Sequence, residues 1–105
     1  MAQIISTEPA IADLEAIADF IAIEDPVAAA GLVRRVLRHV EQLADHPKSG
    51  SRPRELGRSR YRQVVEPPCR VFYRTAKGAV YVLHVTRTER QIDIGRLKAR
   101  SKRQR

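Results

Sequence analysis

The chain has 105 residues, enough for one domain around a single hydrophobic core and too few for two. Its 20 Lys and Arg outnumber 12 Asp and Glu, and the resulting net charge of +8 favours an acidic partner such as nucleic acid or an acidic protein. A single cysteine excludes a disulfide framework and a thiolate metal cluster. No signal peptide and no apolar stretch of the roughly 18 residues needed for a membrane span are present, so we expect a soluble, cytoplasmic protein without a membrane partner.

The N-terminal part of the chain is predicted to hold a short strand and a helix. Residues 3–6 form a short apolar run that could be an edge strand. Thr7 is a plausible N-cap for a helix that runs to about Ile23. Apolar residues recur at helical spacing along this helix and should form its buried stripe: Ile11, Leu14, Ile17, Ala18 and Ile21.

A second helix is predicted directly after the first. Asp25 followed by Pro26 is typical of a helix start, and the helix should run to about Asp45, where His46 and Pro47 stop it. Its expected buried residues are Val33, Val36, Leu37, Val40, Leu43 and Ala44. Its solvated outer side should carry Arg34, Arg35 and Arg38. Because the link between the helices is short, they should form an antiparallel hairpin that covers one face of a sheet.

Three β-rich runs follow a surface loop, at residues 60–66, 69–76 and 79–87, and predict an antiparallel meander. Lys77-Gly78 forms the second turn, because glycine tolerates positive φ. The expected pairs across this turn are Ala76 with Ala79, Arg74 with Tyr81, Phe72 with Leu83, and Arg70 with Val85. Pro67-Pro68 is placed in a loop that pairs Glu66 with Arg70.

Side-chain alternation then divides the sheet into two faces. The face expected under the hairpin contains Cys69, Val71, Tyr73, Val80, Val82 and His84. The opposite face contains Arg60, Arg62, Arg70, Phe72, Arg74, Tyr81, Leu83, Val85 and Arg87. The fold class is therefore α+β, with a domain over residues 1–98 that ends in a short helix or strand-like segment. We expect residues 99–105 to be a basic, disordered tail.

No common catalytic motif is present, and the chain should need neither a metal nor another cofactor. The three histidines, His39, His46 and His84, are dispersed and lack partners at ligand spacing. Cys69 lacks an adjacent histidine to activate it and should be structural. The remaining candidate is the arginine-bearing face, because grouped arginines can hold phosphates and stabilise charge developing on phosphorus. Alternatively, several of these arginines form ordinary ion pairs with Glu66, Glu89 or Asp93.

Several segments together resemble the RelE/ParE superfamily of toxins from type II toxin–antitoxin modules, also called plasmid-stabilisation proteins. They are ADLEAIADFI, EDPVAA, LADHPKSG, YRQVVEPPCRVFYR and AVYVLHVTRTER. The resemblance covers about residues 4–92. It implies a toxin that arrests growth, an acidic antitoxin segment that wraps the basic toxin surface, and repression of operator DNA through the antitoxin.

The superfamily has two branches with different targets. RelE-like members are endoribonucleases that cut mRNA on the ribosome, and the matching residues here would be Arg62, Arg70, Arg87 and Arg90. ParE-like members inhibit DNA gyrase and need no hydrolytic centre. Val64, Thr88 and Ile94 stand where the nuclease branch would have a lysine, an arginine and a tyrosine, and the long hairpin suits the ParE branch, which we therefore favour.

The antitoxin or the target is expected to bind on the arginine-bearing face of the sheet. The residues expected to make this contact are Arg60, Arg62, Arg70, Phe72, Arg74, Tyr81 and Arg87. A further alternative is a non-toxic nucleic-acid-binding module that uses the basic C-terminal tail.

Overall fold

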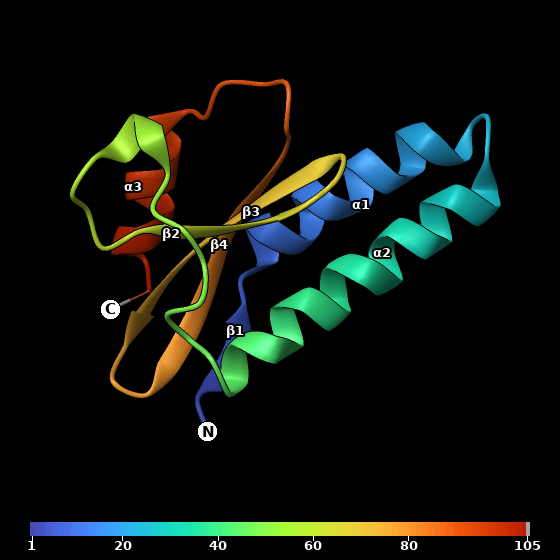
Figure 1. The fold of residues 1–105 in the computed structure, drawn as a ribbon. Coiled ribbons are helices and arrows are strands. Elements are labelled where there is room, and N and C mark those ends of the chain that lie inside the picture. Colours follow the sequence, from blue (N-terminus) through green and yellow to red (C-terminus); the bar gives the residue numbers. More distant parts are fainter. Residues whose placement is uncertain (105) are drawn as a thin grey trace.

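The computed structural model describes residues 1–104 and has the α+β architecture expected from the sequence (Figure 1). Its strands and helices, in chain order, are β1 Gln3–Ser6, α1 Glu8–Ala22, α2 Pro26–Glu41, β2 Arg62–Glu66, β3 Cys69–Ala76, β4 Ala79–Arg87 and α3 Ile94–Lys102. Two 3-10 turns, η1 Gln42–Ala44 and η2 Arg54–Leu56, lie between α2 and β2. The four strands form one sheet in the order β1-β4-β3-β2, with β1 parallel to β4 and the other pairs antiparallel.

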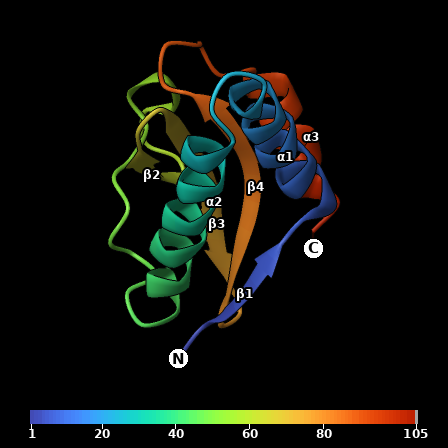
Figure 2. The same cartoon turned by 90° about the vertical axis from the view of Figure 1, so that its right-hand side faces the viewer.

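The helical hairpin forms as predicted, with its two helices on one face of the sheet and α3 on the other (Figure 2). Asp25 caps α2, because its side chain accepts a hydrogen bond from the Ala28 amide at 3.0 Å, and Pro26 occupies the first turn. Thr7 precedes α1, but its hydroxyl donates to the Val82 carbonyl at 2.8 Å instead of capping the helix. The start of α1 is thus fastened to the sheet.

The main core lies between the hairpin and the sheet. Leu14 of α1 and Leu32, Val36 and Val40 of α2 pack against valines of β3 and β4. Leu37, predicted to be buried, is 48% exposed, whereas Leu32, absent from the predicted stripe, is 1% exposed. The buried side of α2 is therefore rotated slightly from the predicted buried side. The position of the sheet beneath the helix determines which side of the helix is buried.

The β2–β3 register differs from the prediction by one residue. Pro67 and Pro68 fill a two-residue turn, so Glu66 pairs with Cys69 and Arg62 pairs with Tyr73. Because paired residues share a face, this register places Arg62 on the hairpin side of the sheet. The predicted pairing of Glu66 with Arg70, and with it Arg62 on the opposite face, is wrong.

The β3–β4 register is as predicted only near the Lys77-Gly78 turn, where both residues have positive φ. Ala76 pairs with Ala79 and Arg74 with Tyr81, as expected. An irregularity between Phe72 and Tyr73 then shifts the ladder by one residue. The resulting pairs are Phe72 with His84, Val71 with Val85, Arg70 with Thr86, and Cys69 with Arg87. The predicted faces of His84, Val85 and Arg87 are therefore reversed.

The second sheet face is covered by α3 and carries its own apolar cluster. Leu97 of α3 is fully buried together with Phe72 and Leu83 of the sheet. Because Leu97 and Ser101 are buried on one side of α3, the helix continues to Lys102 and includes residues 99–102 of the expected disordered tail. Residue 105, the end of that tail, lies outside the described residues. Over residues 1–104, the helices are too short and too polar to cross a membrane.

Candidate functional site

The arginines expected to form one cluster lie on both sides of the sheet. Arg70 and Arg74 are on the face covered by α3, in register with Thr86 and Tyr81. Arg62 and Arg87 are on the hairpin face, in register with Tyr73 and Cys69. The sheet therefore does not bring Arg62, Arg70 and Arg87 together around one anion.

Arg70 is engaged within the protein. Its guanidinium donates two hydrogen bonds to the Glu55 carboxylate, both at 2.9 Å, and its Nε donates to Gln63 Oε1 at 2.9 Å. The same group lies 4.8 Å from the centre of the Phe72 ring. Bidentate binding by Arg70 lowers the pKa of Glu55. Arg70 is thus in an ion pair, but its partner is Glu55 and not one of the acids that the ion-pair alternative named.

Arg74 is also occupied, by the end of α3. Its Nε donates to Ser101 Oγ at 2.7 Å, its Nη2 donates to the Ser101 and Gln104 carbonyls, and its Cζ lies over the Tyr81 ring, 4.6 Å from the ring centre. Arg60 donates to the same hydroxyl at 3.2 Å. Burial lowers the pKa of Arg74. These residues hold α3 on the sheet.

Arg62 supports the loop before β2. Its guanidinium donates to the Gly50 carbonyl at 2.9 Å, while the Gly50 amide donates to the Tyr73 hydroxyl at 2.9 Å. Tyr73 in turn donates to the Pro47 carbonyl at 2.9 Å. Burial raises the pKa of Tyr73, which favours the protonated hydroxyl that this bond requires.

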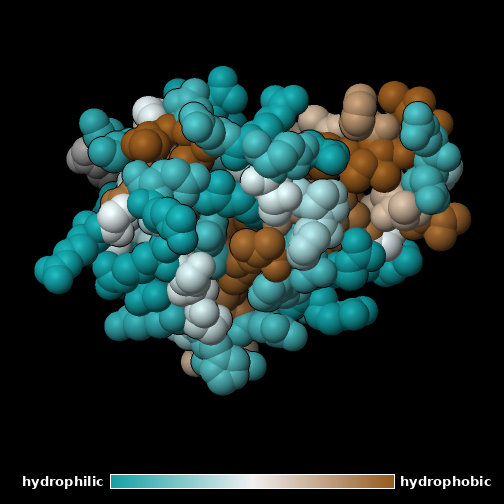
Figure 3. Space-filling model, turned by 45° about the horizontal axis from the view of Figure 1, so that its top comes forward, coloured by the Kyte–Doolittle hydropathy of each residue, from teal (hydrophilic) through white to brown (hydrophobic). Residues whose placement is uncertain are grey.

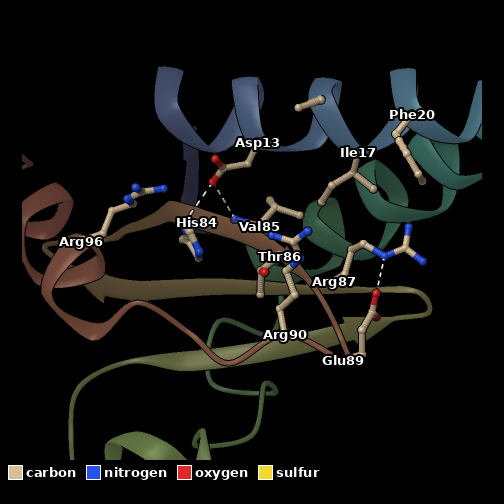
Figure 4. Close-up of a pocket in the computed structure, with 11 residues that line it drawn as sticks. Asp13, Ile17, Phe20, His84, Val85, Thr86, Arg87, Glu89, Arg90 and Arg96 are labelled. Carbon is tan, nitrogen blue, oxygen red and sulfur yellow. Dashed lines mark hydrogen bonds and ion pairs between the residues drawn. The ribbon is translucent and has the colours of Figure 1, made fainter.

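A groove of about 590 Å³ runs between α1 and the end of β4 (Figure 4). Its apolar lining comes from Ala16, Ile17 and Phe20 of α1 and from Val85 of β4. Its basic lining comes from Arg87, Arg90 and Arg96. Arg87 bonds to Glu89 at 2.5 Å, as the ion-pair alternative expected. The groove therefore offers an apolar floor with arginines beside it, and it contains two of the predicted site residues, Arg87 and Arg90.

The groove lining also contains part of a largely buried polar cluster that the sequence did not reveal. Asp13 of α1 accepts from Arg100 of α3 at 2.6 Å and from the Val85 amide at 3.0 Å. His84 Nδ1 lies 3.2 Å from Asp13 and 2.7 Å from Arg100. Burial alone would raise the pKa of Asp13, but the hydrogen bonds from its neighbours outweigh burial and lower the pKa to about 2. Asp13 is therefore a carboxylate that joins α1, β4 and α3.

The cluster was missed because its three members are far apart in the sequence and their meeting depends on where α3 packs. The predicted apolar stripe of the first helix does not include Asp13, and the predicted register places His84 in the core beneath the hairpin. Cys69 is fully buried, and burial raises the pKa of its thiol, as befits a structural residue. Within residues 1–104, no group of three His, Cys, Asp or Glu side chains could hold a metal ion.

Comparisons with known proteins agree on one family. Residues 4–92 match the family described as "ParE toxin of type II toxin-antitoxin system, parDE". Toxin RelE2 from Caulobacter vibrioides (strain ATCC 19089 / CIP 103742 / CB 15) is 34% identical over 91 residues, which cover 86% of this chain and 99% of that toxin. A solved chain from the chromosomal ParDE system of P. aeruginosa superimposes with a TM-score of 0.72 at 26% identity, covering 85% of this chain and 98% of that chain. The chain therefore belongs to the ParE toxin family and is the toxin of a type II toxin–antitoxin system, whose partner is a cognate antitoxin.

Proposed function

We propose that this toxin arrests growth by binding and inhibiting DNA gyrase rather than by cutting mRNA. The observation that carries the proposal is the separation of three of the four candidate nuclease arginines. Arg62 and Arg87 lie on one face of the sheet, and Arg70 lies on the other in a bidentate bond to Glu55. Stabilising a transition state requires preorganised donors that converge on one developing charge, and these three do not converge.

The proposal is tested by a supercoiling assay with purified gyrase and purified toxin. We expect the toxin to block supercoiling, and pre-incubation with its antitoxin to restore it, because the antitoxin competes for the free toxin. In cells, induction should raise the DNA damage response before translation stops. Full gyrase activity at a large excess of toxin, together with mRNA cut at codon positions, would instead support the ribosome-dependent nuclease.

We further propose that an acidic segment of the antitoxin binds in the groove between α1 and β4. The apolar lining made by Ile17, Phe20 and Val85 suits one side of an amphipathic segment. Arg90 suits its carboxylates, as does Arg87, whose partner in the free toxin is the exposed Glu89. The face with Phe72 and Arg74 is less suitable, because α3 covers it and both residues are buried.

Reversing the charge of the groove should weaken antitoxin binding. The double substitution Arg87→Glu with Arg90→Glu is expected to raise the Kd by about tenfold or more, mainly at low salt, because charge attraction is screened by ions. Calorimetric titration with the antitoxin measures this change. The matched control, Arg34→Glu with Arg38→Glu, makes the same change in net charge on the exposed side of α2 and should alter the Kd much less. Equal losses in both variants would mean that net charge alone matters and that the groove is not the site.

A further inference from the structure

The end of the helical hairpin carries a patch of exposed apolar residues, which we call the hairpin tip. Its members are Phe20 at the end of α1, Ile23 in the connection and Val27 in the first turn of α2, and they are 69%, 80% and 79% exposed. The tip projects beyond the β2–β3 turn (Figure 1), and apolar side chains gather there on the molecular surface (Figure 3). Single exposed apolar residues are common, but three gathered at one projecting end indicate a contact surface.

The charge around the hairpin tip is opposite to that of the rest of the protein. Residues 1–33 carry six of the twelve acidic residues and none of the twenty Lys and Arg. Three of these acids, Asp19, Glu24 and Asp25, are exposed around the tip. The groove arginines Arg87 and Arg90 lie on other elements of the fold. The molecule thus presents an acidic, apolar tip and a basic groove, and the two surfaces meet at Phe20.

The difference in charge between the two surfaces indicates which kind of partner fits each of them. An acidic antitoxin segment would be attracted by the groove and repelled by the hairpin tip. We propose that the hairpin tip is the surface that binds the toxin's target protein, at an apolar pocket rimmed by Lys and Arg. The inference rests on the proposed function in requiring a protein target, but it does not require that the target be gyrase.

The test compares variants of the hairpin tip with a matched control. Ile23→Ser with Val27→Ser removes two exposed side chains that do not line the groove, whereas Phe20 is left unchanged because it lines the groove. The control, Leu37→Ser with Val65→Ser, removes two apolar side chains that are 48% and 44% exposed elsewhere. All variants should keep the wild-type melting temperature, since exposed substitutions rarely change stability by more than about 0.5 kcal/mol.

We expect the tip variant to lose growth arrest on induction and to inhibit gyrase about tenfold or more less effectively, because apolar anchors at interface centres dominate affinity. Its Kd for the antitoxin should stay within about threefold of the wild-type value. The control should behave as wild type in all three measurements. Glu24→Lys, which reverses a charge at the tip, should also weaken inhibition if the target surface is basic.

Three results would overturn the inference. The first is that the tip variant arrests growth as strongly as wild type. The second is that the tip variant loses affinity for the antitoxin as well. The third is that the wild-type toxin sediments as a dimer and the tip variant as a monomer. The last two would assign the tip to the antitoxin or to a second copy of the chain. If wild-type toxin leaves gyrase unaffected while only the tip variant stops arresting growth, the gyrase proposal fails and the target surface stands.

Discussion

Replacing Gly50 with alanine is expected to destabilise the protein by about 3 kcal/mol, because the new methyl group has no space. A Cβ at this position would lie 2.5 Å from the Tyr73 hydroxyl oxygen and 2.7 Å from the Gln63 carbonyl oxygen. Both are held in place, the first by hydrogen bonds to Gly50 and Pro47 and the second by the bond from the Ser51 amide at 2.9 Å. Relief of the clash would break the contacts that fasten this loop to β2 and β3. Urea unfolding followed by circular dichroism measures the loss.

The matched control for this prediction is Gly95→Ala. A Cβ at Gly95 would have Asp93 Oδ1 at 3.6 Å, an ordinary contact, and the residue lies in α3. Alanine there should be neutral or stabilise the protein by up to about 1 kcal/mol, because glycine is a poor helix former. A Gly50→Ala protein as stable as wild type would show that the loop can move and that the Tyr73 bonds do not fix it.

Replacing Asp13 with asparagine should cost about 2 to 3 kcal/mol near neutral pH, and this cost should disappear in acid. The pKa of Asp13 falls from its usual 3.8 to about 2 in the folded protein, and each unit corresponds to about 1.4 kcal/mol. Since the folded-state pKa lies below the unfolded value, the carboxylate stabilises the protein fully above about pH 4 and loses this effect as the pH falls toward 2. The measurement is the free energy of unfolding of both proteins across that range.

The Asp13 prediction has its control on the same helix. Asp19→Asn changes an exposed carboxylate of α1 and should alter stability by less than about 0.5 kcal/mol. Because Asp13 binds Arg100, its substitution should also loosen α3, which hydrogen exchange of the α3 amides would detect. A destabilisation of Asp13→Asn that is the same at pH 6 and pH 2 would show that the side chain acts through packing and not through its charge.

The family and the fold could be inferred from local features of the sequence. Asp25-Pro26 starts the second helix, the Lys77-Gly78 turn fixes the nearest strand pairs, and the apolar spacing predicts a hairpin on a meander. Each of these signals depends on residues close together in the chain, whose conformations are set by sterics and by periodic burial. Those signals predicted the fold, whereas the family was identified from the resemblance of longer segments, such as YRQVVEPPCRVFYR, to known toxins.

Which residues share the candidate site depends on one-residue shifts in strand register, and the residues close together in the chain do not specify these shifts. Successive side chains of a strand point to opposite faces of the sheet. The tight turn at Pro67-Pro68 therefore places Arg62 on the hairpin face, and the irregularity near Phe72 places Arg87 on the same face, in both cases opposite to the prediction. The sequence alone determined which secondary-structure elements form and that the protein is basic. The tertiary structure decided which arginines share a surface and that Asp13, His84 and Arg100 meet, because these arrangements depend on register and on the packing of α3, which bring together residues distant in the chain.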